Sequence, residues 1–248
     1  ISLSGGFNGW IFFLAFIGSV IFAVLFGIIM DFIINKPLKG EPVFSIIMAT
    51  ISLAIILRSL TAILAGPLSI IPISPFGDQT FFLNGVVISI LDISIIFSAI
   101  IIISSFYYFF NYTKWGIAMK ATSADAEAAQ LLGVPVDKVY RYVWIFASLV
   151  GVLSGIMLAP RMALIDTSMS FLGLKAFPAA ILGGFGSIKG AIVGGIILGI
   201  IETVSLGTLS FHFSWIKEIN DIIIWIVLIA VLMIRPDGLF GVSKVKRV

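Results

Sequence analysis

Residues 10–30 read WIFFLAFIGSVIFAVLFGIIM and contain no charged side chain. A helix of about 20 apolar residues is long enough to cross the roughly 30 Å hydrocarbon core of a bilayer. Further apolar runs of the same character follow this one, and a soluble fold could not cover all of them with polar surface. The chain is therefore expected to be an integral membrane protein that crosses the bilayer several times.

The composition limits the chemistry that the chain can perform. Hydrophobic residues make up 60% of its 248 residues and charged residues 11%, and no cysteine is present. Disulfides, thiolate metal sites and cysteine nucleophiles are thereby excluded. The single histidine, His212, leaves no paired-histidine zinc motif. A net charge of +3 in a membrane chain records topology and does not point to nucleic acid. We expect no cofactor and no metal.

Apolar runs separated by glycine, proline and charge clusters predict the membrane helices. The predicted spans are residues 10–34, 43–64, 85–108, 140–159 and 215–234. Residues 66–84 contain three prolines and are expected to form a loop. The glycine-rich residues 175–205 are expected to form two short helices joined by a tight turn at residues 183–187. The predicted fold is an all-α polytopic membrane protein with about six to seven membrane helices, including this glycine-rich pair.

Basic residues orient this map, because loops rich in lysine and arginine lie on the cytoplasmic side. With residues 112–141 in the cytoplasm, the outer loops hold only Arg161, Lys175 and Lys217. The inner loops and the C-terminal tail then hold Lys36, Lys39, Lys114, Lys120, Lys138, Arg141, Lys189, Arg235, Lys244, Lys246 and Arg247. The glycine-rich segment must then cross twice or re-enter the membrane, since a single crossing would place the basic tail outside. We therefore expect a multi-pass protein of the plasma membrane whose C-terminus lies in the cytoplasm.

Residues 112–141 are a polar segment between two apolar runs, and they contain EAAQLLG at 127–133. Ser123 or Asp125 could cap a short helix there, and Gly133 could end it. Its expected apolar face consists of Ala128, Ala129, Leu131 and Leu132. Two interpretations stay open from these residues alone. The helix could insert into a groove on a partner, or it could lie on the bilayer surface.

Three segments together resemble one known family. Glu127-Ala128-Ala129, followed three residues later by Gly133, resembles the EAA loop of ATP-binding-cassette (ABC) importers, which docks into the ATPase subunit. Residues 120–139 around it, the segment LGGFGSIKGA at 182–191 and KPLKG at 36–40 are similar to the H-type permeases of branched-chain amino-acid ABC importers. The three motifs occur in the family's order, and the resemblance covers most of the chain from about residue 30 onward.

The resemblance implies specific partners and contact residues. The contact with the ATPase would be made by Asp125, Glu127, Ala128, Ala129, Leu132 and Gly133. Expected partners are ABC ATPase subunits, a second (M-type) permease subunit and an extracytoplasmic amino-acid-binding protein. Residues 1–248 would form a single permease domain, and residues 113–139 its cytoplasmic coupling loop. The chain begins at Ile1, and the family's further N-terminal membrane sequence is expected to be missing.

Glycines and charges within the apolar segments suggest a transport pathway. Broken helices tend to line such pathways, so the candidates are Gly183, Gly184, Gly186, Ser187 and Glu202. Glycines four residues apart also allow helices to pack closely, which is the structural alternative. Arg58 is expected to snorkel or to neutralise a carboxylate such as Asp92, and Asp31 to lie at the membrane interface.

The predicted function is that of a transmembrane permease subunit of an ATP-driven importer for branched-chain amino acids. The sequence contains no GxxxxGK[ST] phosphate loop, so ATP hydrolysis is expected in separate subunits and no enzymatic activity in this chain. One alternative is a related permease for urea, amides or sugar. Another is a secondary transporter without ATPase partners, for which Asp92 and Glu202 are the available midplane carboxylates.

Overall fold

The computed structural model describes residues 9–38, 41–65, 80–83, 86–162, 169–184, 186–209 and 216–241. Within these residues, five helices are long and apolar enough to cross a membrane. They lie at Trp10–Asn35, Phe44–Leu64, Ile90–Tyr112, Val136–Arg161 and Ile188–Thr208, and two shorter apolar helices lie at Leu172–Gly183 and Ile222–Ile234. The prediction of an all-α polytopic membrane protein is confirmed.

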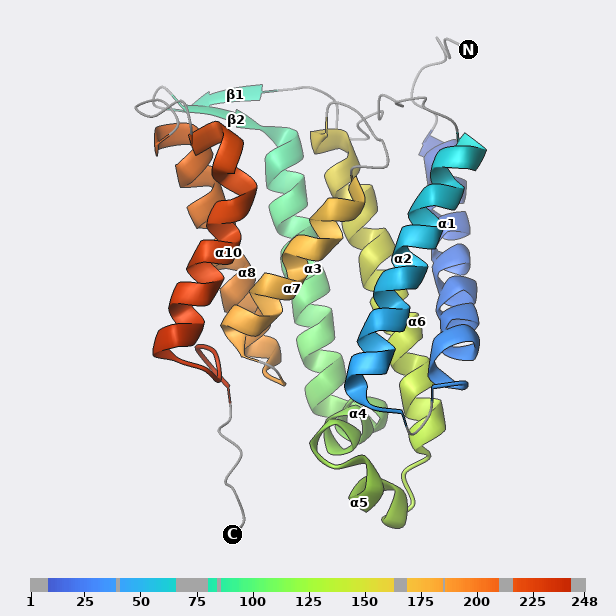
Figure 1. Ribbon diagram of the computed structural model, residues 1–248. Helices are drawn as coiled ribbons and strands as arrows, with labels where there is room; N and C mark the ends of the chain where they lie inside the picture. Colours follow the sequence, from blue (N-terminus) through green and yellow to red (C-terminus); the bar gives the residue numbers. More distant parts are fainter. Residues whose placement is uncertain are drawn as a thin grey trace. The chain divides into compact units, whose positions relative to one another are not determined.

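The chain divides into two compact units, residues 1–167 and residues 168–248. In order, the first unit contains α1 (Gly9–Met30), the π-helical turn η1 (Asp31–Asn35), α2 (Val43–Ala65), β1 (Thr80–Leu83), β2 (Val86–Ser89), α3 (Ile90–Tyr112), α4 (Lys114–Ala124), α5 (Ala126–Leu131), α6 (Val136–Leu158) and the short η2 (Ala159–Arg161). Figure 1 shows the strands at one end of α3 and the helices α4 and α5 beyond its other end.

The β-hairpin departs from the sequence prediction, which placed a loop over residues 66–84 and began the next helix at residue 85. Strands β1 and β2 pair antiparallel from Thr80 opposite Ser89 to Leu83 opposite Val86, and α3 begins only at Ile90. Ser89 ends the strand because its side chain accepts a hydrogen bond from the N–H of Leu91 and caps α3. The missed signal is Asn-Gly at 84–85 between two apolar four-residue runs, which favours a two-residue hairpin loop.

Helices α1 and α6 pack closely in the first unit. A Cβ atom on Gly27 would lie 2.6 Å from the Cα atom of Ile145, so only glycine allows this approach. Ala23, one turn earlier on α1, is fully buried. Helix α6 begins at Val136, one turn before the predicted start at residue 140, because Val136 and Val139 are both buried against their neighbours.

The second unit contains α7 (Ser170–Gly183), α8 (Ile188–Val204) with its continuation η4 (Ser205–Leu209), and α10 (Ile216–Ile234). Its core consists of Leu182, Leu198, Ile224 and Leu228. The prediction of two helices joined at residues 183–187 is confirmed. The prediction that both are short is wrong for α8, which with η4 is long enough to span.

Candidate functional site

The polar segment after α3 forms two helices that lie beyond the spans. Thr113 separates α3 from α4: its hydroxyl donates to the carbonyl of Phe109 at 2.6 Å and accepts from the N–H of Gly116 at 3.1 Å. A side chain on Gly116 would overlap the backbone of Phe109 and Phe110. The chain can therefore turn sharply into α4, and Figure 1 shows α5 as the outermost helix at this end of the first unit.

Asp125 caps the N-terminus of α5. Its Oδ1 accepts a hydrogen bond from the N–H of Ala128 at 2.9 Å, and its carboxylate complements the positive end of the helix dipole. Ser123, the other cap candidate, instead donates to the carbonyl of Lys120 at 2.8 Å. The structure thus selects Asp125 from the two candidates.

Gly133 ends α5 as the sequence predicts. Its φ of 85° lies in the left-handed region, where a side chain is strained. The N–H of Gly133 donates to the carbonyl of Gln130, and the N–H of Val134 to that of Ala129, both at 3.0 Å. This pair of bonds is the Schellman motif. A six-residue helix is too short to be stable alone, so these caps and the neighbouring helices maintain it.

The apolar residues of α5 point in two directions. Leu131 and Leu132 are 89% and 86% exposed, and Glu127 and Ala128 are exposed beside them. Ala129 is only 3% exposed. Of the predicted apolar face, Ala129 is therefore buried and packs α5 onto its own unit, whereas Ala128 and the two leucines are exposed.

The glycine turn between α7 and α8 is tightly packed. Gly184 and Gly186 have φ angles of 105° and 87°, and the Ser187 hydroxyl caps α8 by accepting from the N–H of Gly190 at 3.0 Å. A Cβ atom on Gly183 would overlap the backbone of Gly190.

The segment that follows α10 covers the end of α7. The N–H groups of Leu239 and Phe240 donate to the carbonyls of Leu182 and Gly183 at 2.8 and 2.9 Å. The carbonyls of Leu182 and Gly183 are therefore hydrogen-bonded within the protein.

Glu202 lies at the other end of α8 and pairs with a lysine that the sequence analysis assigned to an outer loop. The Nζ atom of Lys175, on α7, lies 2.6 Å from Oε1 of Glu202, and the two side chains are 29% and 28% exposed. Contacts of Gly183 with Gly190 and of Gly194 with Ala179 set the helix register. In each contact the position moves by four residues along both helices. Continuing this register by four more residues brings Lys175 to within one helical turn of Glu202, and the long lysine side chain covers that distance. The sequence spacing alone gave no signal for this pair.

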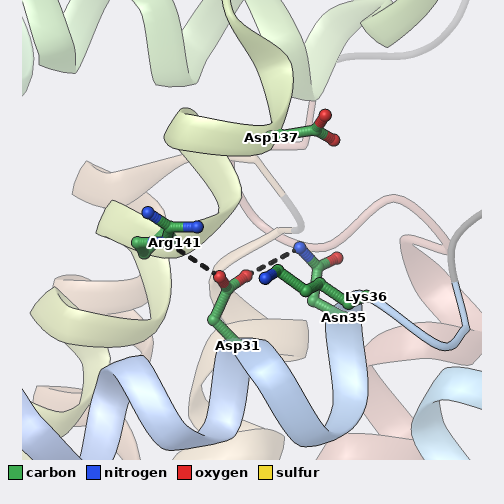
Figure 2. Close-up of a pocket in the computed structure, with 5 residues that line it drawn as sticks. All are labelled: Asp31, Asn35, Lys36, Asp137 and Arg141. Carbon is green, nitrogen blue, oxygen red and sulfur yellow. Dashed lines mark hydrogen bonds and ion pairs between the residues drawn. The ribbon is translucent and has the colours of Figure 1, made fainter.

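A second charged cluster joins η1 to α6. Figure 2 shows Asp31 between Arg141 and Asn35. Oδ2 of Asp31 accepts from Nε of Arg141 at 3.1 Å, and Oδ1 accepts from the Asn35 amide at 2.8 Å. With Lys36 and Asp137 these residues line a cavity of about 240 Å³. Asp31 is only 2% exposed, so its carboxylate is covered by the protein itself, near the end of the Trp10–Asn35 helix.

Asp92 also has a partner that the sequence analysis did not identify. Its Oδ1 lies 3.2 Å from Nη1 of Arg161, at the end of α3 next to the hairpin, and both side chains are substantially exposed. The partner found for Asp92 is thus Arg161, where the sequence suggested Arg58. Among the described residues, no group of three or more histidine, aspartate or glutamate side chains could hold a metal ion.

Comparison with known proteins matches residues 3–232 to the family model described as a branched-chain amino acid transport system permease component. The chain is 28% identical to the high-affinity branched-chain amino acid permease LivH of Escherichia coli (strain K12), over 97% of this chain and 78% of the relative. It is 27% identical to the corresponding permease BraD of Pseudomonas aeruginosa, over 94% and 76%.

A shorter similarity extends to a sugar permease. The fructose import permease FrcC of Rhizobium meliloti is 28% identical over 42% of this chain and 31% of its own length. No solved structure gives a significant match.

Proposed function

Because the chain belongs to the family of branched-chain amino-acid transport permeases, we propose that it imports branched-chain amino acids as one subunit of an ATP-driven transporter. Separate ATPase subunits drive it, a second permease subunit completes the pathway, and an extracytoplasmic protein delivers the amino acid. The two compact units act together as one permease domain, and residues 113–139 are its coupling loop. The polar segment and the C-terminus lie in the cytoplasm, as the distribution of basic residues supports.

The observation that carries the proposal is the position of Leu131 and Leu132. They are almost fully exposed on a helix that is capped at both ends and held to its own unit through Ala129. Two adjacent leucines exposed beyond the spans gain free energy when a partner covers them. Helix-in-groove recognition uses such a short, pre-formed apolar edge. Asp125 and Gly133 contribute by holding the helix, and Glu127 and Ala128 by flanking the leucines.

Replacing the exposed leucines tests this contact without disturbing the protein's own packing. We expect Leu131→Asp/Leu132→Asp to abolish co-purification of the ATPase subunits from membranes, while the thermal stability of the permease is unchanged. Ala121→Asp, an exposed position on α4, is the matched control and should retain the ATPase. Retained ATPase in the leucine variant would mean that α5 lies on the bilayer surface instead. Failure of the unmodified protein to recover any ATPase would favour a secondary transporter.

The transport pathway is proposed to follow α7 and α8. Lys175 and Glu202 form an ion pair within apolar helices, where charged side chains are costly and tend to face a cavity or a partner. Gly183, Gly184, Gly186 and Ser187 form the packed end of this helix pair, more than 20 Å along α8 from Glu202 at about 1.5 Å per residue. We assign Glu202, with Lys175, to the pathway and the glycine turn to its support.

The second candidate is a permease for sugar, and the partial similarity to a fructose permease favours it over urea or amides. Uptake into proteoliposomes that contain the complete transporter and its binding protein separates the two. Labelled leucine uptake that excess isoleucine suppresses and excess fructose does not would support the amino-acid assignment. The opposite pattern of competition would replace it with the sugar assignment.

A further inference from the structure

The contact between α1 and α6 ends in an ion pair next to the proposed coupling loop. Gly27 on α1 lies against Ile145 on α6. Four residues further along the chain, at the start of η1, Asp31 bonds to Arg141, four residues earlier on α6. The two helices are therefore antiparallel and in contact over at least one full turn. The close approach at Gly27 and the ion pair together define one register of the two helices, and the ion pair is the polar part of this contact.

The burial of Asp31 makes this pair more than a surface contact. Its side chain is 3% exposed and has two partners, Asn35 and Arg141, whose own side chain is 45% exposed. A buried carboxylate without its cation is strongly unfavourable. The arrangement in which Asp31 keeps both partners is therefore favoured over the alternatives. Surface pairs, by contrast, contribute little.

The backbone at Asp31 is shaped for this contact. Residues 31–35 form a π-helical turn, in which the N–H of Lys36 donates to the carbonyl of Asp31 at 3.1 Å. A π-helical turn is rare and often occurs at functional positions. Here the side chain of Asn35 also reaches back to the carboxylate of Asp31.

Helix α6 connects this pair to α5. The loop after α5 leads into α6 at Val136, where Val136 and Val139 are buried, and Arg141 follows within the next turn. A displacement of α5 therefore reaches Arg141 over a short, packed path. Since Arg141 is bonded to Asp31, the same displacement reaches α1.

We propose that Asp31 and Arg141 are positioning residues that make α1 and α6 move as one body when the ATPase subunits displace α5. This inference rests on the proposed function, because it requires a driven α5. Without the pair, α6 would move while α1 lagged behind, and ATP would be hydrolysed with less transport. Asn35 assists by holding the second oxygen of Asp31.

The test measures the amount of amino acid imported per ATP hydrolysed by the complete transporter in proteoliposomes. We expect Asp31→Asn and Arg141→Gln each to lower this ratio roughly five-fold, while the ATPase subunits stay bound. Asp31→Asn/Arg141→Gln, in which no charge is left without its partner, should regain the stability lost in Arg141→Gln but not the ratio. Arg141→Lys, which keeps the cation, should restore part of the ratio.

Asp92→Asn/Arg161→Gln is the matched control, because it removes the more exposed ion pair of the same unit, and it should leave the ratio unchanged. An unchanged ratio in Asp31→Asn and Arg141→Gln, whatever their stability, would overturn the proposal and leave the pair a structural staple. Loss of the ATPase in the Leu131→Asp/Leu132→Asp variant is scored separately, by co-purification. A failure of the docking proposal is therefore distinguishable from a failure of this one.

Discussion

Alanine at Gly194 should separate α7 from α8, and the magnitude follows from the contact that the added methyl group would make. Its Cβ atom would overlap the carbonyl oxygen of Ala179 and lie 2.9 Å from the N atom of Gly183. Favourable carbon contacts begin near about 3.5 Å, so the helices must move apart by about 1 Å. The obstructing atoms belong to the backbone of α7, which cannot rotate away as a side chain can.

Two opposing contributions decide the size of the effect. Overpacking of this kind costs about 1–3 kcal/mol, whereas replacing a helical glycine by alanine stabilises the helix by about 0.5–1 kcal/mol. We therefore expect Gly194→Ala to lower the free energy of unfolding by up to about 2.5 kcal/mol. Gly199→Ala on the same helix is the matched control, because nothing lies within 4 Å of its added Cβ atom, and it should be neutral or stabilising.

The measurement is reversible unfolding of the purified protein in mixed micelles, followed by circular dichroism. The difference between the two variants isolates the α7–α8 contact, since the propensity gain is common to both. Equal stability of Gly194→Ala and Gly199→Ala would refute the close approach of these helices. Gly183→Ala, which would overlap the backbone of Gly190, should then also be tolerated.

Three further predictions concern the two charged helix ends and the sidedness of the chain. Asp125→Ala removes the cap of α5 and should cost about 1 kcal/mol of local stability, whereas Asp125→Asn should retain the cap; proteolysis of the loop and ATPase affinity report the difference. Lys175→Gln leaves the Glu202 carboxylate without this cation and should destabilise the protein by about 2 kcal/mol, and adding Glu202→Gln should restore stability while transport stays low. Between the hairpin and α5, only α3 is long and apolar enough to cross a membrane. A membrane-impermeant thiol reagent should therefore label Phe82→Cys and Leu132→Cys from opposite sides of the membrane in this cysteine-free chain; labelling of both from one side would contradict a spanning α3.

The membrane character and most helix positions could be predicted because they depend on local properties. An uncharged run such as residues 10–30 must form a helix in lipid, where every backbone N–H and C=O needs a partner. Glycine next to a short polar helix likewise predicts its end, and Gly133 confirms this. The hairpin at 80–89 was missed because its apolar strands resemble the start of the following span.

The sequence by itself determined that this is a multi-pass membrane protein of a permease family, with a capped helix at Ala126–Leu131 and a glycine turn between α7 and α8. The tertiary structure alone decided which charges meet. Asp31 joins Arg141, 110 residues away, and Lys175 joins Glu202, 27 residues away. It also turned Ala129 inward and left Leu131 exposed. The physical reason is that hydropathy and capping act over one or two helical turns, whereas ion pairs and burial depend on the register of helices that are distant in the chain.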